Sequence, residues 1–142
     1  MNKTLLFRTF KIGGIPKAAL SRILTEGVLL SDEGIGGSVT YRNYRAPGKY
    51  HGWRRNWFSG SLVMTRESLL AFRYSKPIIG LRWVDGQVGQ LHFETDGDNS
   101  LSIGFDASVF SEESSGRVEV RFSTAKARSF LMTFKRKTAG PG

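Results

Sequence analysis

The sequence predicts a mainly β protein of about seven short strands that ends in one amphipathic helix. Between residues 28 and 122, apolar residues repeatedly alternate with polar ones, which is the period of a half-buried strand. Clusters of Gly, Asp, Asn and Ser separate these runs and are typical of turns. After residue 123 the apolar spacing changes to that of a helix.

A short helix is expected before the strands. Pro16 suits a first helical turn, apolar residues follow at helical spacing, and Gly27 ends the segment. Residues 1–25 are therefore interpreted as an N-terminal extension with a short helix. The β domain with its C-terminal helix is expected over 26–137, and a frayed, disordered tail over 138–142.

The strands are expected to be short and separated by polar connections. A turn is expected at 31–34 and another at Asp96–Asn99. The stretch 43–56 is rich in Gly, Pro, Arg and aromatic residues and is expected to be a loop. The predicted strands are residues 28–30, 36–42, 56–64, 69–74, 78–84, 89–94, 101–105 and 118–122.

The C-terminal helix is expected from Thr124 to about Lys137, with Ser123 or Thr124 as its N-cap. Three basic residues at 135–137 lie in its last turn, where cations favour the helix dipole. The five basic residues of the helix are interpreted as an ordinary solvated face in preference to a partner-binding one: Lys126, Arg128, Lys135, Arg136 and Lys137. The residues expected to face the core are Phe130, Leu131 and Phe134.

Residues 60–72 read Gly-Ser-Leu-Val-Met-Thr-Arg-Glu-Ser-Leu-Leu-Ala-Phe and predict two strands joined by a tight turn at Thr65–Ser68. The residues expected to share one face are Leu62, Met64, Leu69 and Ala71. This pattern resembles the central hairpin of GRAM domains and of the wider pleckstrin-homology-like (PH-like) superfamily. Glu26-Gly27-Val28-Leu29 resembles the first strand of that family, and the resemblance covers about residues 26–136.

The resemblance implies a strongly bent sheet or barrel with the C-terminal helix plugging one open end. It also implies a non-enzymatic binding module. In PH-like proteins that bind phosphoinositides, basic residues around the first strand pair commonly form the ligand site, and Lys49, Arg54 and Arg55 lie in about that region. The fold alone does not fix the ligand.

Length and composition narrow the possible functions. A chain of 142 residues predicts one domain. The absence of cysteine excludes disulfides, thiolate metal sites and cysteine nucleophiles. The net charge of +9 is unevenly distributed: residues 1–82 carry a net +10, 83–116 a net −7 and 117–142 a net +6. Basic surfaces attract nucleic acid or anionic membrane, although solubility is an equally good explanation of the charge.

The strongest candidate site is the segment 41–58, which holds five Lys or Arg, six aromatic residues and no acid. Arginine supplies fork-shaped donors to phosphate oxygens, and exposed Trp and Tyr suit a membrane interface or stack on unpaired bases. In the alternative interpretation, the aromatic side chains pack in the core and the charges are solvated. The candidate anion-binding residues are Arg42, Arg45, Lys49, Arg54 and Arg55, with Trp53 and Trp57 as an aromatic flank.

No metal, cofactor or catalytic set is predicted. The acidic cluster from Glu94 to Asn99 lacks the later bidentate Glu of an EF-hand, and a hairpin turn explains it better. His51 and His92 are the only histidines, too few for a zinc site. The glycine pairs lack the Lys and Ser or Thr of a phosphate-binding loop. We therefore expect a protein that is not an enzyme.

The expected location is the cytoplasm, with peripheral membrane attachment as an option. The N-terminus starts like a signal sequence, but Arg8 and Lys11 interrupt the apolar run, and no stretch approaches the 18 apolar residues of a membrane span. Three functions are open. The first is a binding module for a protein partner or an anionic phosphate-bearing surface. The alternatives are single-stranded nucleic-acid binding on a barrel and a ligand-carrying β-barrel.

Overall fold

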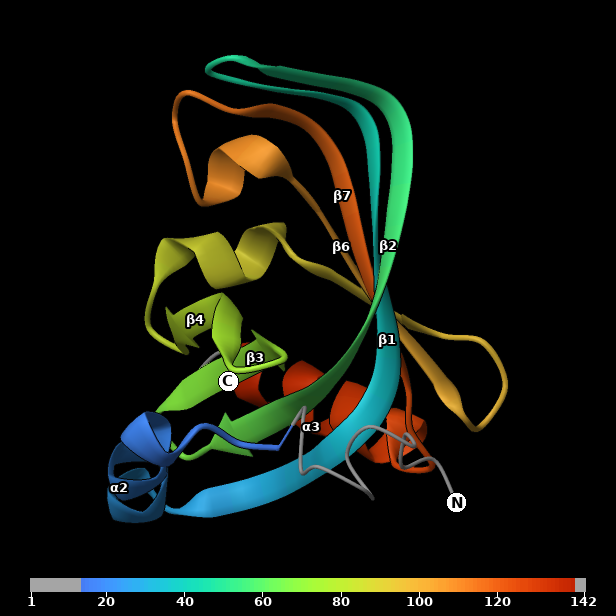
Figure 1. The fold of residues 1–142 in the computed structure, drawn as a ribbon. Coiled ribbons are helices and arrows are strands. Elements are labelled where there is room, and N and C mark those ends of the chain that lie inside the picture. Colours follow the sequence, from blue (N-terminus) through green and yellow to red (C-terminus); the bar gives the residue numbers. More distant parts are fainter. Residues whose placement is uncertain (1–13, 140–142) are drawn as a thin grey trace.

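The computed structural model describes residues 14–139, in which seven antiparallel strands form one strongly curled sheet (Figure 1). The strand order is β4-β3-β2-β1-β7-β6-β5. The prediction of a mainly β protein with a C-terminal helix is confirmed. The elements are α2 (Lys17–Glu26), β1 (Val28–Ala46), β2 (Lys49–Thr65), β3 (Ser68–Arg73), β4 (Lys76–Arg82), η1 (Gly86–Gln90), β5 (His92–Thr95), β6 (Ser100–Asp106), η2 (Ala107–Val109), β7 (Ser115–Ser123) and α3 (Ala127–Thr138).

The first two strands are much longer than predicted, at 19 and 17 residues. The prediction of a loop at 43–56 is wrong, because β1 and β2 pair continuously out to Ala46 and Lys49. Only Pro47 and Gly48 form the turn, where Gly48 has a φ of 73°. The Tyr and Trp residues of this stretch favour strand, and the pairing of β2 with β1 overrides the Gly, Pro and Arg content that suggested a loop.

The turn expected at 31–34 is also wrong. β1 continues through it, with an irregularity between Glu33 and Ile35 relative to β2. Gly34 has a φ of 66°, a left-handed conformation that glycine adopts without strain. Residues 31–34, which suggested a turn, therefore belong to the strand and lead into a β-bulge.

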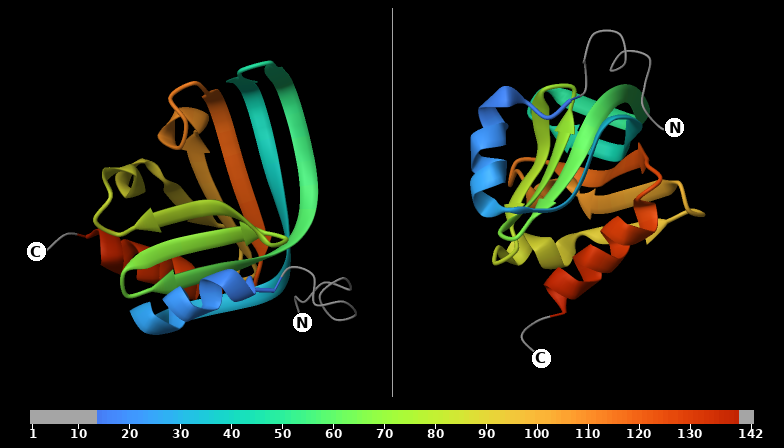
Figure 2. Two further views of the ribbon diagram at one scale, coloured as in Figure 1. Left: turned by 60° about the vertical axis from the view of Figure 1, so that its left-hand side comes forward. Right: turned by 90° about the horizontal axis from the view of Figure 1, so that it is seen from below.

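β1 and β2 run through both halves of the curled sheet (Figure 2). In one half, β2 pairs with β3 from Gly60 to Met64, and β3 pairs with β4. In the other half, β1 pairs with β7 from Gly37 to Arg45, and β7 pairs with β6. The two halves face each other and enclose the main core.

The strands bend where glycines allow a close approach. A Cβ added to Gly60 would lie 2.2 Å from the carbonyl oxygen of Phe72 and 2.8 Å from the Phe58 ring. A Cβ added to Gly37 would lie 2.6 Å from the same ring. The Phe58 ring also packs edge-on against Phe122, with 5.7 Å between centroids. Phe58 therefore fills the inside of the bend, and the glycines make room for it.

The central hairpin is formed as predicted. β2 and β3 are joined at Thr65–Ser68, and Met64 pairs with Leu69. The four residues predicted to share a face all lie in the main core: Leu62, Met64, Leu69 and Ala71.

The C-terminal helix α3 closes the core beside β5 and β6. Phe130 and Phe134 are buried, as predicted, whereas Leu131 is only half-buried. The Phe134 ring stacks on Phe93 at 3.9 Å between centroids. The helix begins later than predicted, at Ala127, and has no side-chain N-cap bond. Thr124 instead accepts a bond from the Lys126 N–H and donates to Asp32, so it ties the start of the helix to β1.

The predicted N-terminal helix is confirmed as α2, which covers the outer side of β2 and β3 (Figure 2). Ile23 packs there with Val63, Leu70 and Phe72. Burial raises the pKa of Glu26, but its hydrogen bonds with Thr65, Arg22 and Ser68 outweigh this and lower it overall. The Thr65 hydroxyl donates to Glu26 over 2.6 Å. The charged carboxylate thus links α2 to the β2–β3 hairpin.

Three smaller expectations also differ. Residues 86–90 form the short helix η1, so the strand expected at 89–94 begins only at His92. β4 ends at Arg82, two residues before the predicted end at Val84. Thr138, expected in the tail, belongs to α3. Residues 140–142 of the predicted tail and residues 1–13 of the predicted extension lie outside the described part.

Replacing Phe130 with Ala should lower the free energy of unfolding by about 3–5 kcal/mol, because the buried ring leaves a cavity. Met132 lies on the same helix and is 59% exposed, so Met132→Ala should change stability by no more than about 0.5 kcal/mol. Urea unfolding measures both. Equal midpoints for the two variants would contradict the core position of α3.

Gly60→Ala should destabilise the protein by about 1–3 kcal/mol, because the new methyl group meets the Phe72 carbonyl. Gly80 is the matched control, since it also lies in a strand but a Cβ there meets nothing within 4 Å. Gly80→Ala should leave stability unchanged or slightly higher. Thermal and urea unfolding of both variants are the measurements, and a harmless Gly60→Ala would show that the bend does not need glycine.

Candidate functional site

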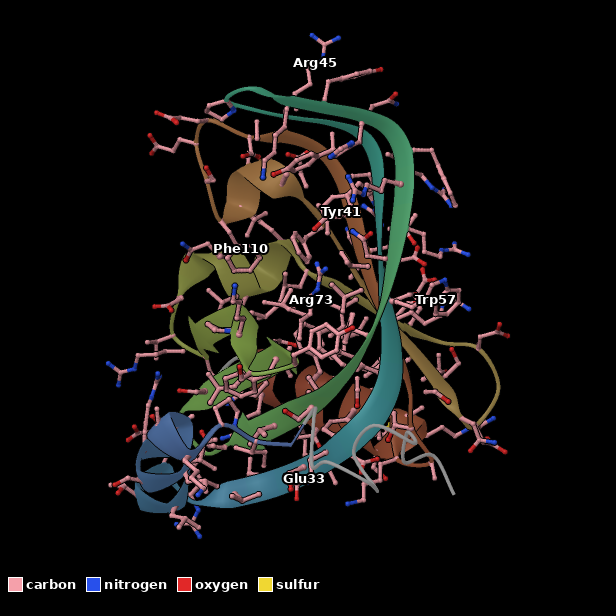
Figure 3. All side chains as sticks on the ribbon, viewed as in Figure 1. Glu33, Tyr41, Arg45, Trp57, Arg73 and Phe110 are labelled. Carbon is pink, nitrogen blue, oxygen red and sulfur yellow. The ribbon has the colours of Figure 1, made fainter. Side chains whose placement is uncertain are left out.

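The five predicted cations all lie on the β1–β2 hairpin, but they fall on two sides of it. Lys49 and Arg54 line a groove on the inside of the curled sheet. Arg55 follows Arg54 on β2 and packs against Trp53 and Trp57. In Figure 3 Tyr41 and Arg73 lie inside the curl, whereas Trp57 points away from it. The structure therefore does not bring the five cations onto one concave surface.

The outer side of the hairpin carries the other three cations, Arg42, Arg45 and Arg55, interleaved with exposed aromatic rings. The guanidinium carbon of Arg55 lies 5.4 Å from the Trp53 ring centroid and 5.8 Å from that of Trp57. Its Nε donates to the Thr40 hydroxyl over 2.9 Å. The Trp53 and Trp57 side chains are 60% and 71% exposed. The two tryptophans predicted as an aromatic flank are thus on the surface, and the interpretation that they pack in the core is wrong.

The groove is formed where the β1–β2 hairpin faces the β3–β4 turn. It comprises two adjoining cavities of about 530 and 220 Å³, which share Tyr41 and Arg73. Four cationic side chains line it, together with His51, three tyrosines and Asn56, and no carboxylate lies among the described residues of its lining. The four cations are Lys49, Arg54, Arg73 and Lys76.

An irregularity in the hairpin places Lys49 and Arg54 on the same side. Residues five apart in a regular strand point to opposite sides. Asn43 has a φ of 51°, and the pairing of β1 with β7 slips by one residue between Arg42 and Arg45. Beyond this bulge, Tyr44 joins Tyr41 in the groove, with 4.8 Å between ring centroids, and His51 stacks on Tyr44.

Gly116 permits this bulge. It has a φ of 104°, and a Cβ there would lie 2.4 Å from the Asn43 carbonyl oxygen. The β7 backbone therefore approaches the bulged residue more closely than any side chain would allow.

Tyr74 fixes the β3–β4 turn against the hairpin. Its N–H donates to the Ser59 carbonyl over 2.9 Å, and its hydroxyl donates to the Trp57 carbonyl over 3.3 Å. Tyr74 has a φ of 56°, which costs a non-glycine residue about 1–2 kcal/mol. These contacts hold Arg73 and Lys76, at either end of the turn, beside the groove.

The charges of the groove are unbalanced. Within residues 14–139, none of its four cations makes an ion pair, and the described ion pairs lie elsewhere. The predicted turn at Asp96–Asn99 is confirmed, and its carboxylates pair with Arg121 and Arg128 on β7 and α3. Asp96 and Asp98 therefore neutralise cations on a different surface. Across the described residues, no cluster of His, Cys, Asp or Glu could hold a metal ion.

Arg73, Tyr74 and Lys76 are groove residues that the sequence analysis did not identify. They lie in the turn between two apolar strands, where a short basic and aromatic cluster was the only local signal. Only the pairing of β2 with both β1 and β3 brings this turn next to Arg54.

No protein-family model matches the chain, and the comparison with curated proteins found no match. The resemblance to PH-like domains stays a prediction. In the part of the chain that the structure describes, no helix has the length and apolar character needed to cross a membrane.

Proposed function

We propose that this protein is a non-enzymatic, PH/GRAM-like binding module whose groove takes a phosphate-bearing head group at an anionic surface. The observation that carries the proposal is the set of four cations that two hairpins bring to one groove, none of which has an ion-pair partner among residues 14–139. Arginine forks and lysine ammonium groups are the usual partners of phosphate oxygens. Tyr41, Tyr44 and Asn56 add neutral donors beside them.

The smaller part of the groove suits a small charged group. Its cavity of about 220 Å³ is lined by polar and aromatic side chains, whereas the adjoining cavity of about 530 Å³ is also lined by the apolar residues Val39, Pro77 and Ile78. The main core between the two halves of the sheet is filled by buried apolar side chains. A barrel that carries an apolar ligand inside is therefore the less favoured interpretation.

The outer side of the hairpin supports attachment to an extended surface. Tyr50, Trp53 and Trp57 are between 59% and 71% exposed, and Arg45 and Arg55 stack on them. Such amphipathic rings with cations suit the interface between lipid head groups and water. A convex, projecting hairpin can contact a flat bilayer while its inner side binds one head group.

Single-stranded nucleic acid is the second candidate. Trp53 and Trp57 lie on one exposed side of a sheet with Arg55 between them, an arrangement on which unpaired bases stack. Stacking would use the outer side of the hairpin, whereas a head group would use the groove. Variants of the groove separate the two.

The direct test is co-sedimentation of the full chain with phosphatidylcholine vesicles containing phosphatidylinositol bisphosphate or, at equal surface charge, phosphatidylserine. Arg73→Glu/Lys76→Glu should weaken phosphoinositide binding at least about tenfold, because each cation near an anionic bilayer contributes about 1 kcal/mol. Lys17→Glu/Lys135→Glu makes the same change of charge on exposed residues away from the groove. This control variant should lose much less affinity for the phosphoinositide vesicles.

Soluble inositol trisphosphate distinguishes a groove ligand from general attraction to the membrane. It should compete in the wild type and not in the groove variant. Equal losses in the groove and control variants would contradict the proposal. Binding of a single-stranded oligonucleotide that survives Arg73→Glu/Lys76→Glu, without vesicle binding, would favour the nucleic-acid alternative.

A further inference from the structure

Among the strands that the structure describes, the first half of β2 has β1 as its single neighbour and so forms a free edge of the sheet. β3 pairs with β2 only from Gly60 to Met64, whereas β1 pairs with β2 along its whole length. No other described strand lies beside residues 49–57 of β2, and most of these residues are exposed. This segment therefore presents backbone N–H and C=O groups along one side.

The direction of these groups follows from the contacts of Tyr74. The Ser59 carbonyl accepts from the Tyr74 N–H, and the Trp57 carbonyl accepts from its hydroxyl, so both carbonyls point away from β1. Backbone groups alternate in direction along a strand, and β1 and β2 pair without a slip from Gly37 to Arg42. The N–H and C=O of Arg55 therefore point to the free edge.

A free edge is a template for another strand, and its charge indicates which strand would fit. Residues 49–57 carry Lys49, Arg54 and Arg55, with no acid and no proline. Pairing with a second copy about a two-fold axis would place cations beside cations. For example, a two-fold axis at Arg55 sets the two copies of Arg55 opposite each other, which is destabilising. A strand rich in carboxylates would instead meet cations on both of its faces.

We propose that the free edge of β2 binds an acidic, extended segment of a partner protein as an added strand. The added strand would pair with the backbone of Arg55, and its carboxylates would meet Arg55 on the outer side and Arg54 on the groove side. Trp53 and Trp57 flank Arg55 and hold its guanidinium in place. This partner goes beyond the head-group function, because its recognition depends on the backbone of β2 and not on Arg73 or Lys76.

The test uses a fluorescent peptide of about ten residues, long enough to span the edge, in which pairs of Glu alternate with pairs of Thr so that carboxylates lie on both faces of the added strand. Two peptides serve as controls: one with Lys in place of Glu, and one with the same acidic sequence but an N-methyl group on every residue, so that neither edge can donate. The N-methylated peptide keeps every charge and cannot form the ladder. Fluorescence anisotropy with the full chain should show at least about tenfold weaker binding for each control, as expected for two lost hydrogen bonds or reversed charge.

A matched pair of variants tests the same edge from the protein side. Arg55→Ala and Arg55→Pro remove the same charge and the same bond to Thr40. Only proline also removes the outward N–H, and edge positions tolerate it. Arg55→Pro should bind the acidic peptide at least about fivefold more weakly than Arg55→Ala. Circular dichroism and thermal unfolding check that both variants fold. If Arg55→Pro does not fold, the comparison of the acidic and N-methylated peptides on the wild-type chain still tests the proposal.

Equal binding of the acidic and N-methylated peptides would overturn the proposal, because it would show that charge alone, without backbone pairing, accounts for the binding. A concentration-dependent dimer that Arg55→Pro abolishes would overturn it in favour of a second copy. Loss of vesicle binding in Arg73→Glu/Lys76→Glu, with peptide binding retained within about threefold, would support two separate sites. If vesicle binding fails in every variant while the peptide binds as described, the head-group function fails alone.

Discussion

The ring of Phe58 lies against two glycines at the point where β1 and β2 bend, and the rest of the structure depends on this close packing. Gly37 and Gly60 leave no room for a side chain, because a Cβ at either would meet the ring within 2.8 Å. Phe58 and Phe122 then fill the inside of the bend edge to face. Because the strands turn here without breaking, one sheet forms both walls of the core, which α3 and the short helices η1 and η2 complete.

The same bend creates both candidate binding surfaces. Below it, β2 pairs with β3, whereas above it β2 has no second neighbour among the described strands. The free part of β2 stands opposite the β3–β4 turn, and the space between them is the groove. One side of the hairpin therefore presents Arg54 to the groove and the other presents Arg55 with its two tryptophans. Adjacent arginines on one strand thus serve different surfaces.

Local sequence patterns predicted the elements whose side chains strictly alternate or follow a helical period, such as the β2–β3 hairpin and α3. They failed for the outer half of the β1–β2 hairpin, because its Gly, Pro and Arg content is typical of a loop. Its structure is instead decided by the pairing of β1 with β2 and with β7. They identified Lys49 and Arg54 by composition. They could not identify Arg73, since only the sheet topology brings it close, nor the bulge at Asn43 that turns Lys49 inward.

The central claim is that Arg54 faces the β3–β4 turn across the groove while Arg55 faces away. The chain has no cysteine, so engineered pairs can be cross-linked without interference. Arg54→Cys/Arg73→Cys and Arg55→Cys/Arg73→Cys differ by one position on β2, and a short bismaleimide reports which pair lies on the same side. We predict efficient intramolecular cross-linking of the first pair and little of the second. Equal cross-linking of both, or preference for the second, would contradict the arrangement from which both binding surfaces are derived.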